Sequence, residues 1–362
     1  MSDRLLVGTR KGLFTVDKQS TRWTLREPAF LGDPVTAVLA RDGGNTIHAA
    51  LNLGHFGVKM RRSRDAGKTW EEQAAPAYPP QPENASGPAW KLVQVWTLEN
   101  GGSDEPGVLW AGTIPGGLFR SNDDGDTWSL VRSLWEHPQR AEWMGGGYDA
   151  PGMHSVCVDP RDSRRVSVAV STGGVWQTRD RGETWALRAS GMRAEYMPPD
   201  QQGNPLVQDV HRMVACRGNP DVMWVQHHNG VFRSTDGAQS WTEIKTAALS
   251  AFGFAVAVDP NDANTAWFVP AVKDEKRVPV NAQLAVTRTR DGGRTFEVLR
   301  EGLPAGPAYD LIYRHALDID AAGQRLAFGS TTGGLWISEN RGDSWQCVSA
   351  HLPPIAAVRF VS

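Results

Sequence analysis

The chain has 362 residues, of which 40% are hydrophobic and 22% are charged, a composition that excludes a disordered, collagenous or coiled-coil protein. Its formal net charge is −2 and it has no long basic run, so we expect no nucleic-acid partner. No stretch approaches the roughly eighteen apolar residues of a membrane span, and the first residues lack the apolar core of a signal peptide. We therefore expect a soluble, cytoplasmic protein that does not bind a membrane.

A motif of the form Ser/Thr-x-Asp-x-Gly-x-Thr-Trp recurs along the chain. Well-preserved copies occupy residues 63–70, 121–128, 178–185 and 289–296, the last with Phe in place of Trp. The copy at 234–241 has Ala238 in place of the glycine, the copy at 338–345 has Asn340 in place of the aspartate, and a seventh around Trp23 retains little else. The closing aromatic residues lie on the order of 50 residues apart, enough for one four-stranded sheet in each of seven repeats.

Each repeat has the composition of short strands joined by turns. Its apolar runs are rich in Val, Leu, Trp and Phe and are bounded by Gly, Pro, Asn and Asp, which favours strands over helices. The motif itself predicts a hairpin turn in which Asp accepts backbone N–H groups, Gly takes a positive φ, and the aromatic packs between sheets. We predict innermost strands at 155–158, 213–215, 255–258 and 316–319.

The two ends of the chain complement each other. The chain begins at the second strand of a sheet, at 4–7, and ends in a lone apolar run at 356–361. We expect this run to supply the missing innermost strand, which would close a ring and remove exposed sheet edges. The predicted fold is an all-β, seven-bladed β-propeller, with a single domain over residues 1–362.

The repeated motif is similar to the Asp-box of the BNR repeat proteins. That group includes bacterial sialidases, xyloglucan-active glycosidases, sortilin-type receptors and a photosystem assembly factor. The resemblance covers nearly the whole chain and implies a β-propeller, but the boxes of that group are structural and its functions are diverse. The chain departs from sialidases because it has neither a Phe/Tyr-Arg-Ile-Pro segment near its start nor an evident arginine triad.

Long connections and histidines are predicted to share one face of the ring. The connections at 71–91, 129–153, 186–210, 272–283 and 297–314 all fall on this face, where a binding site is expected. Three histidines each begin an innermost strand, with Gln94 at the matching place of the third repeat, and further polar residues lie in the turns of the same face. These residues are His154, His211 and His315 on the strands, and His55, His228, Arg10 and Lys11 in the turns.

Three imidazoles that meet at one channel mouth suggest a metal site. His154, His211 and His315 are the predicted ligands of a divalent ion such as Zn²⁺, Mn²⁺ or Fe²⁺. A metal-free pocket lined by histidines and a purely structural role in packing are the alternatives. No nucleotide cofactor is expected.

Candidate catalytic and substrate-binding residues surround these histidines. Tyr148-Asp149 and Tyr309-Asp310 precede His154 and His315 by the same spacing, and Asp209 precedes His211 by two residues. A Tyr–Asp pair can serve as acid and base, and a carboxylate beside a histidine can fix its tautomer. The candidate catalytic residues are Tyr309, Asp310, Tyr148, Asp149 and His228. The candidate substrate-binding residues are Arg10, Lys11, His55, Gln94, Trp90 and Trp143. The alternatives are that the Tyr–Asp pairs are a relic of the repeat or a turn without a reactive role, and that the tryptophans hold their loops in place.

The concentration of His, Tyr and Asp on one face favours an enzyme. We expect a hydrolase or lyase that acts on a small polar or sugar-derived molecule at the channel mouth, with or without a divalent metal. A metal-free, sialidase-like glycoside hydrolase and a non-catalytic binding or assembly propeller are the alternatives.

Overall fold

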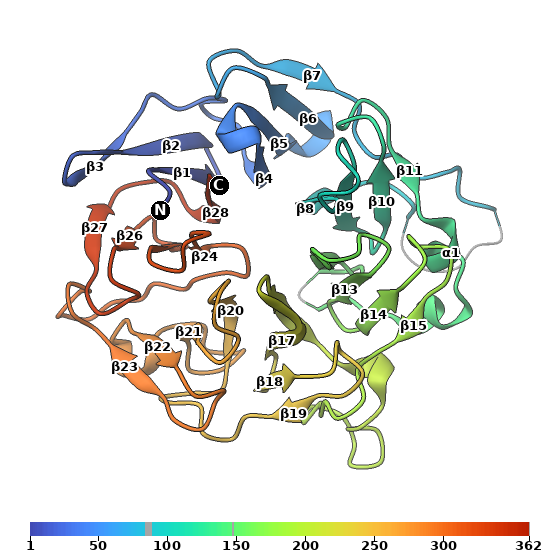
Figure 1. Cartoon of the computed structure of the whole chain (residues 1–362). Helices are drawn as coiled ribbons and strands as arrows, with labels where there is room; N and C mark the ends of the chain where they lie inside the picture. Colours follow the sequence, from blue (N-terminus) through green and yellow to red (C-terminus); the bar gives the residue numbers. More distant parts are fainter. Residues whose placement is uncertain (84–88, 147, 362) are drawn as a thin grey trace.

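The computed structural model describes residues 1–83, 89–146 and 148–361, which form seven four-stranded antiparallel sheets around a central axis (Figure 1). Each sheet is one blade, and its strands follow one another outward from the axis. The predicted all-β, seven-bladed propeller is confirmed.

The strands of the blades, from the axis outward, have the following bounds. The first blade contains β28 (Ile355–Phe360), β1 (Arg4–Thr9), β2 (Gly12–Gln19) and β3 (Arg22–Leu25). The second blade contains β4 (Val35–Arg41), β5 (Thr46–Asn52), β6 (Val58–Ser63) and β7 (Glu71–Gln73). The third contains β8 (Gln94–Asn100), β9 (Leu109–Ile114), β10 (Leu118–Ser121) and β11 (Ser129–Leu130). The fourth contains β12 (Met153–Val158), β13 (Val166–Val170), β14 (Gly174–Thr178) and β15 (Ala186–Leu187). The fifth blade contains β16 (Val210–Cys216), β17 (Asn219–His227), β18 (Gly230–Ser234) and β19 (Thr242–Glu243). The sixth contains β20 (Gly253–Val258), β21 (Ala266–Pro270), β22 (Val286–Thr289) and β23 (Glu297–Leu299). The seventh contains β24 (Leu317–Ile319), β25 (Leu326–Gly329), β26 (Leu335–Ser338) and β27 (Gln346–Ser349).

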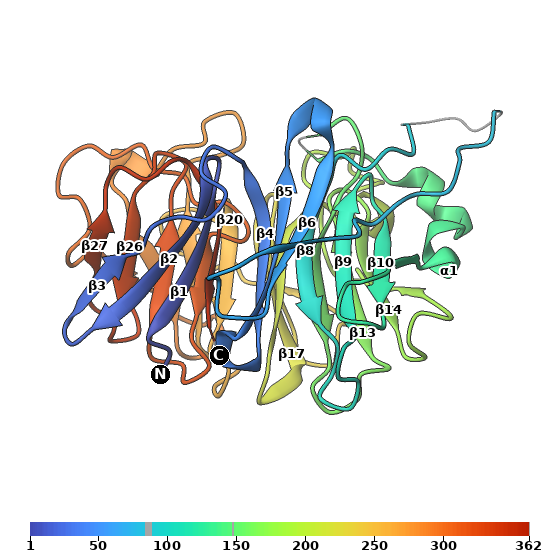
Figure 2. The same ribbon diagram turned by 90° about the horizontal axis from the view of Figure 1, so that it is seen from above.

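Helices are short and lie in the connections. They are α1 (Arg132–Trp135) and the 3-10 turns η1 (Asp42–Gly44), η2 (Gly54–Phe56), η3 (Pro138–Glu142), η4 (Pro205–Val207) and η5 (Val280–Ala282). Within the described ranges, no helix has the length and apolar character needed to cross a bilayer. In side view, the β5–β6 turn rises at one edge of the ring and the N-terminus lies at the other (Figure 2).

The last strand closes the ring, as predicted. β28 pairs antiparallel with β1, with Leu5 opposite Phe360 and Val7 opposite Val358. Both termini therefore meet in one blade (Figure 1).

Large aromatic residues fill the space between blades. Trp110, Trp224 and Trp267 lie in the second strands of their blades and are fully buried, each in an apolar cluster shared with the next blade. Because each sheet is covered on both faces by its neighbours, burial of these side chains ties the blades together.

The repeated motif forms the predicted hairpin turn. In the copy at 63–70, Asp65 Oδ1 accepts the backbone N–H of Thr69 at 2.8 Å, and Ser63 Oγ accepts that of Gly67 at 2.8 Å. Gly67 has a φ of 88°, and in the altered copy Ala238 takes the same left-handed conformation with a φ of 66°. Hydrogen bonds from Thr69 and Ser63 lower the pKa of Asp65 to about 2.

A β-bulge recurs near the start of several innermost strands. The pairing register shifts between Val95 and Thr97 in β8, between Met153 and Ser155 in β12, and between Val210 and Arg212 in β16. The unpaired residues are Trp96, His154 and His211. A bulge re-aims the side chain of its extra residue, and here it sets the positions of the side chains at one mouth of the channel.

Candidate functional site

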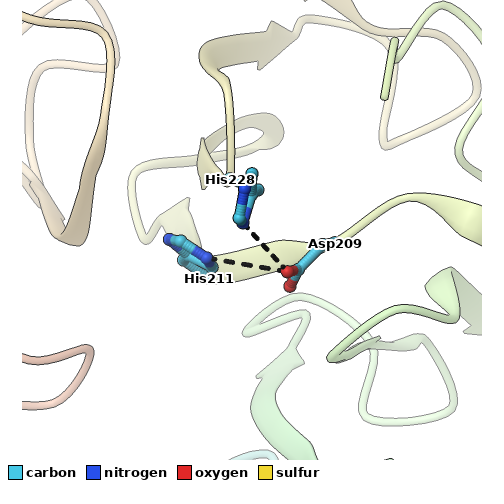
Figure 3. A group of neighbouring side chains, drawn as sticks. All are labelled: Asp209, His211 and His228. Atoms are coloured by element: carbon cyan, nitrogen blue, oxygen red, sulfur yellow. Dashed lines mark ion pairs between the residues drawn. The ribbon is translucent and has the colours of Figure 1, made fainter. Parts of the chain in front are cut away.

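Asp209, His211 and His228 form a compact cluster (Figure 3). Asp209 directly precedes β16, His211 is the bulge residue of β16, and His228 lies in the turn between β17 and β18. Asp209 Oδ2 lies 3.3 Å from His228 Nδ1 and 3.8 Å from His211 Nε2. The start of β16 and the turn after β17, both in the fifth blade, thus place two imidazoles against a single carboxylate.

The cluster is buried on one side and open on the other. Asp209 is 7% exposed and His211 is 2% exposed, whereas the side chain of His228 is 24% exposed. Burial raises the pKa of Asp209, but the two imidazoles outweigh it and lower that pKa well below its ordinary value. Burial lowers the pKa of His211, while for His228 the hydrogen bond and charge of Asp209 overcome burial and raise the pKa.

Backbone and aromatic contacts fix the orientation of both imidazoles. His211 Nδ1 donates to the carbonyl of Gly253 at 2.6 Å, and the His211 ring stacks on Phe254 with centroids 4.3 Å apart. The His228 ring meets the edges of Tyr196 and Phe252 at centroid distances of 5.1 and 5.8 Å. The cluster therefore has little freedom to rearrange.

A buried cation lies close to the cluster. Arg314 is 7% exposed, and its guanidinium lies over the rings of Trp96 and Phe254 at 4.9 and 5.2 Å. In the part of the chain that the structure describes, Arg314 makes no ion pair, and its Nε has no hydrogen-bond partner. Burial lowers the pKa of Arg314, while the charge of Asp209 acts to raise it.

The predicted three-histidine metal set is not formed. His154 Nδ1 lies 2.9 Å from Ser155 Oγ, and His315 Nε2 lies 2.7 Å from the carbonyl of His154, so one nitrogen of each ring is engaged in a hydrogen bond. Over the described ranges, the three-residue group with metal-binding geometry contains His211 but neither His154 nor His315. Burial lowers the pKa values of His154 and His315 well below the ordinary value. The structure supports the packing alternative for these two residues.

The structure also corrects the prediction that Gln94 occupies the position of the three histidines in its own blade. The bulge residue of β8 is Trp96, and Gln94 lies two residues earlier, paired with Ile114. The position that corresponds to His154 is therefore occupied by Trp96, whose ring meets that of His154 at 5.4 Å. Gln94 itself is buried.

The two Tyr–Asp pairs have different surroundings. Asp310 accepts hydrogen bonds from Ser330 Oγ, at 2.7 Å, and from the Thr332 hydroxyl, so its carboxylate holds a loop together. Tyr309 is 62% exposed. Tyr148 is also exposed and meets the edge of Trp96, which places it near the channel mouth, and Asp149 is exposed. Neither pair joins the cluster.

The predicted substrate-binding residues lie apart from the cluster. Trp143 is buried against Trp176, and Trp90 meets the edge of Trp135, so both tryptophans pin their loops, as the alternative interpretation held. Arg10, Lys11 and His55 are exposed in their turns, and the ring of His55 contacts Phe56. Of the predicted site residues, the cluster contains His211 and His228, and its third member is Asp209, the carboxylate that the sequence places two residues before His211.

Sequence reasoning missed the aromatic surroundings of the cluster, whereas the sequence already indicates Arg314 as a basic residue on this face. Phe252 and Phe254 flank the start of β20, the place that histidines occupy in β12 and β16. This matching position on successive blades is the signal that can locate the two phenylalanines.

A cavity of about 430 Å³ runs along the axis. Among the side chains that line it, Arg359 donates two hydrogen bonds to Glu99, at 2.7 and 2.6 Å. This ion pair links β28 to β8.

No family model matches the chain. It is 29% identical to a xyloglucanase of Hypocrea jecorina over 195 residues, which are 49% of this chain and 21% of that protein. It is 28% identical to a sialidase of Bacteroides fragilis over 162 residues, which are 37% of this chain and 29% of that protein. Its relatives thus include glycoside hydrolases.

The fold also matches a solved structure of this group. The GH74 xyloglucanase of Xanthomonas campestris superposes with a TM-score of 0.68 at 19% identity, covering 96% of this chain and 53% of that one. The chain thus spans about half of this solved xyloglucanase, and the matched part amounts to less than a third of either curated relative.

Proposed function

We propose that this protein is a glycoside hydrolase that acts on a sugar-derived substrate at the channel mouth, with Asp209, His211 and His228 as its reacting groups. The observation that carries the proposal is the cluster itself, a buried carboxylate facing two imidazoles, one of which is 24% exposed. Hydrolysis needs a group that activates water beside the scissile bond, and this arrangement supplies one.

The surroundings of the cluster suit a sugar ring. Tyr196, which is 42% exposed, supplies an apolar ring beside the polar cluster, and carbohydrate sites combine such rings with a few fixed polar groups. Phe252 and Phe254 are buried and support the two imidazoles from behind. The exposed Tyr148 lies on the same mouth, against Trp96. Similarity to a xyloglucanase and a sialidase supports glycosidic substrates, although the matches cover only part of those proteins.

The test is turnover of a panel of xyloglucan oligosaccharides, cello-oligosaccharides and sialosides, followed by mass spectrometry of the products. We expect wild-type protein to cleave at least one substrate and Asp209→Asn to lose about 100-fold or more in rate, the scale of a lost acid–base group. Asp200→Asn, an exposed carboxylate of the 186–210 connection, is the matched control and should retain the wild-type rate. A folded wild-type protein that cleaves none of the panel would contradict the proposal.

A sialidase-like reaction at Tyr309 is the second candidate, favoured by the sialidase match and by the exposure of Tyr309. Loss of sialoside turnover in Tyr309→Phe, with Asp209→Asn unaffected, would favour this alternative. The reverse pattern would assign the reaction to the cluster.

A further inference from the structure

We propose that Asp209, His211 and His228 bind one divalent transition-metal ion, with Zn²⁺ as the reference ion. One ligand atom from each residue lies within 4.8 Å of the others, and Asp209 Oδ2 stands 3.3 and 3.8 Å from the two imidazole nitrogens. Ligand atoms about 2.0–2.2 Å from a Zn²⁺ ion lie between roughly 3 and 4 Å from each other, so both distances from Asp209 suit the ion. Binding requires His228 Nδ1 to give up its proton and its hydrogen bond to Asp209, so the ion would take the place of that proton.

The orientation of His211 is the first independent support. Its Nδ1 lies 2.6 Å from the carbonyl of Gly253, and because a carbonyl oxygen only accepts, Nδ1 carries the proton. In the neutral ring, Nε2 then presents its lone pair toward the Asp209 carboxylate at 3.8 Å, too far for a hydrogen bond. A lone pair opposite a carboxylate is repulsive unless a cation lies between them. A metal-bound histidine usually donates the N–H of its other ring nitrogen to a carboxylate or a backbone carbonyl, as His211 does to Gly253.

The unsatisfied carboxylate is the second support. Asp209 is more than nine-tenths buried, and within the described residues its Oδ1 has no hydrogen-bond partner. A buried carboxylate ordinarily accepts hydrogen bonds on both oxygens, whereas here Oδ2 faces the two imidazoles and Oδ1 faces no donor. Coordination of a divalent ion by this carboxylate would compensate the buried oxygen that lacks a partner.

The donor set selects the class of ion. Two imidazole nitrogens and one carboxylate oxygen suit Zn²⁺, Mn²⁺ or Fe²⁺, whereas Mg²⁺ and Ca²⁺ prefer oxygen ligands alone. Three protein ligands leave at least one coordination position for water or substrate, as in catalytic rather than structural zinc sites. The positive charge of Arg314 near Asp209 opposes the bare ion, and it therefore favours an anionic group at the open position.

In the proposed hydrolase, the ion would activate water. This catalytic role rests on the proposed function, whereas the binding of the ion is independent of it. The water would lose a proton to solvent and attack as a bound hydroxide, and the departing sugar oxygen would take up a proton from solvent. Thus the elements of water add across the cleaved bond and no oxidant is needed.

The experiment measures metal directly. Tag-free protein is stripped with chelator, dialysed against Zn²⁺ or Co²⁺, and analysed by elemental mass spectrometry and by the visible spectrum of bound Co²⁺. We expect one ion per chain in the wild type, and at least about 100-fold weaker binding in His228→Ala and in Asp209→Asn. The exposed His351 provides the matched control, and His351→Ala should bind one ion as tightly as the wild type.

Three results would overturn the site: no stoichiometric ion in the wild type, unchanged binding in both His228→Ala and Asp209→Asn, or equal loss in His351→Ala. His228→Gln is a second variant in case the alanine variant does not fold, because glutamine is polar and close to histidine in size, and the side chain of His228 is 24% exposed. Failure of the proposed function has a separate signature, since a protein that binds one ion but cleaves no glycan keeps the site and loses the reaction. Conversely, full turnover in stripped protein would keep the reaction and remove the ion from it.

Discussion

At the scale of single residues, the ion pair between Arg359 and Glu99 joins the closing strand to the third blade across the channel. Their side chains are 24% and 18% exposed, and the two hydrogen bonds are bidentate. We expect Arg359→Ala to lower the free energy of unfolding by about 2–4 kcal/mol, because it leaves Glu99 poorly solvated and unpaired. Urea denaturation of the variant measures this loss.

The control is the double variant Glu99→Leu/Arg359→Met, in which both charges are removed. We expect it to recover most of the lost stability, and a double-mutant cycle should give a coupling well above the scatter of independent sites. Additive losses from the two single variants would mean that the pair contributes nothing as a pair.

At the scale of the element, the repeated hairpin turn depends on its aspartate. In the third preserved copy, Asp180 accepts the Thr184 backbone N–H at 2.9 Å and the Thr178 hydroxyl at 2.6 Å. We expect Asp180→Ala to lower the free energy of unfolding by about 2 kcal/mol, the scale of hydrogen bonds to a charged acceptor.

The chain provides its own matched control. Since Asn340 Oδ1 accepts the Ser344 N–H at 2.9 Å in the last copy, Asp180→Asn should lose less. Equal losses in the two variants would contradict this account.

The same turn gives a dependence of stability on pH. Hydrogen bonds from Thr178 and Thr184 lower the pKa of Asp180 to about 2 in the folded protein, below the ordinary 3.8. A lowered folded pKa contributes stability above pH 3.8, and this contribution is lost as the pH falls toward 2. The difference in Tm between wild type and Asp180→Asn, measured by calorimetry, should therefore shrink between pH 5 and pH 2. A difference that stays constant over this range would show that the carboxylate charge does not matter.

Elements also show what the sequence could and could not predict. The hairpin turns were predictable because Asp, Gly and the aromatic act within eight residues, so local chemistry decides the structure. The positions of His154 and His211 at the starts of innermost strands were predictable for the same reason. Their contacts were not, because a bulge turns each side chain and the neighbouring blade decides what it meets: Phe254 stacks on His211, whereas Ser155 and Trp96 engage His154. His228 joins the cluster from the turn after β17, because His227 pairs with Val210 in the adjacent strand and the backbone N–H of His228 donates to the carbonyl of Asp209 at 2.9 Å. This register of the two strands does not follow from the spacing of the residues.

At the scale of the whole molecule, β28 closes the ring by pairing with β1, and we expect this closure to make the seven blades one cooperative unit. Ile355, Val358 and Phe360 are buried, and without β28 the strand β1 would present an unpaired edge at the axis. We expect a chain truncated after residue 352 to lose cooperative thermal unfolding and to aggregate. A synthetic peptide of residues 353–362, added in excess, should restore cooperative unfolding with a Tm that rises with peptide concentration, because a ligand that binds only the folded state stabilises it by mass action.

A peptide with aspartate at positions 358 and 360 is the control and should not restore cooperative unfolding, since these side chains enter the apolar core between blades. A truncated chain that unfolds cooperatively at the full-length Tm without peptide would show that the first blade does not need its innermost strand, and that the other six interfaces hold the ring closed.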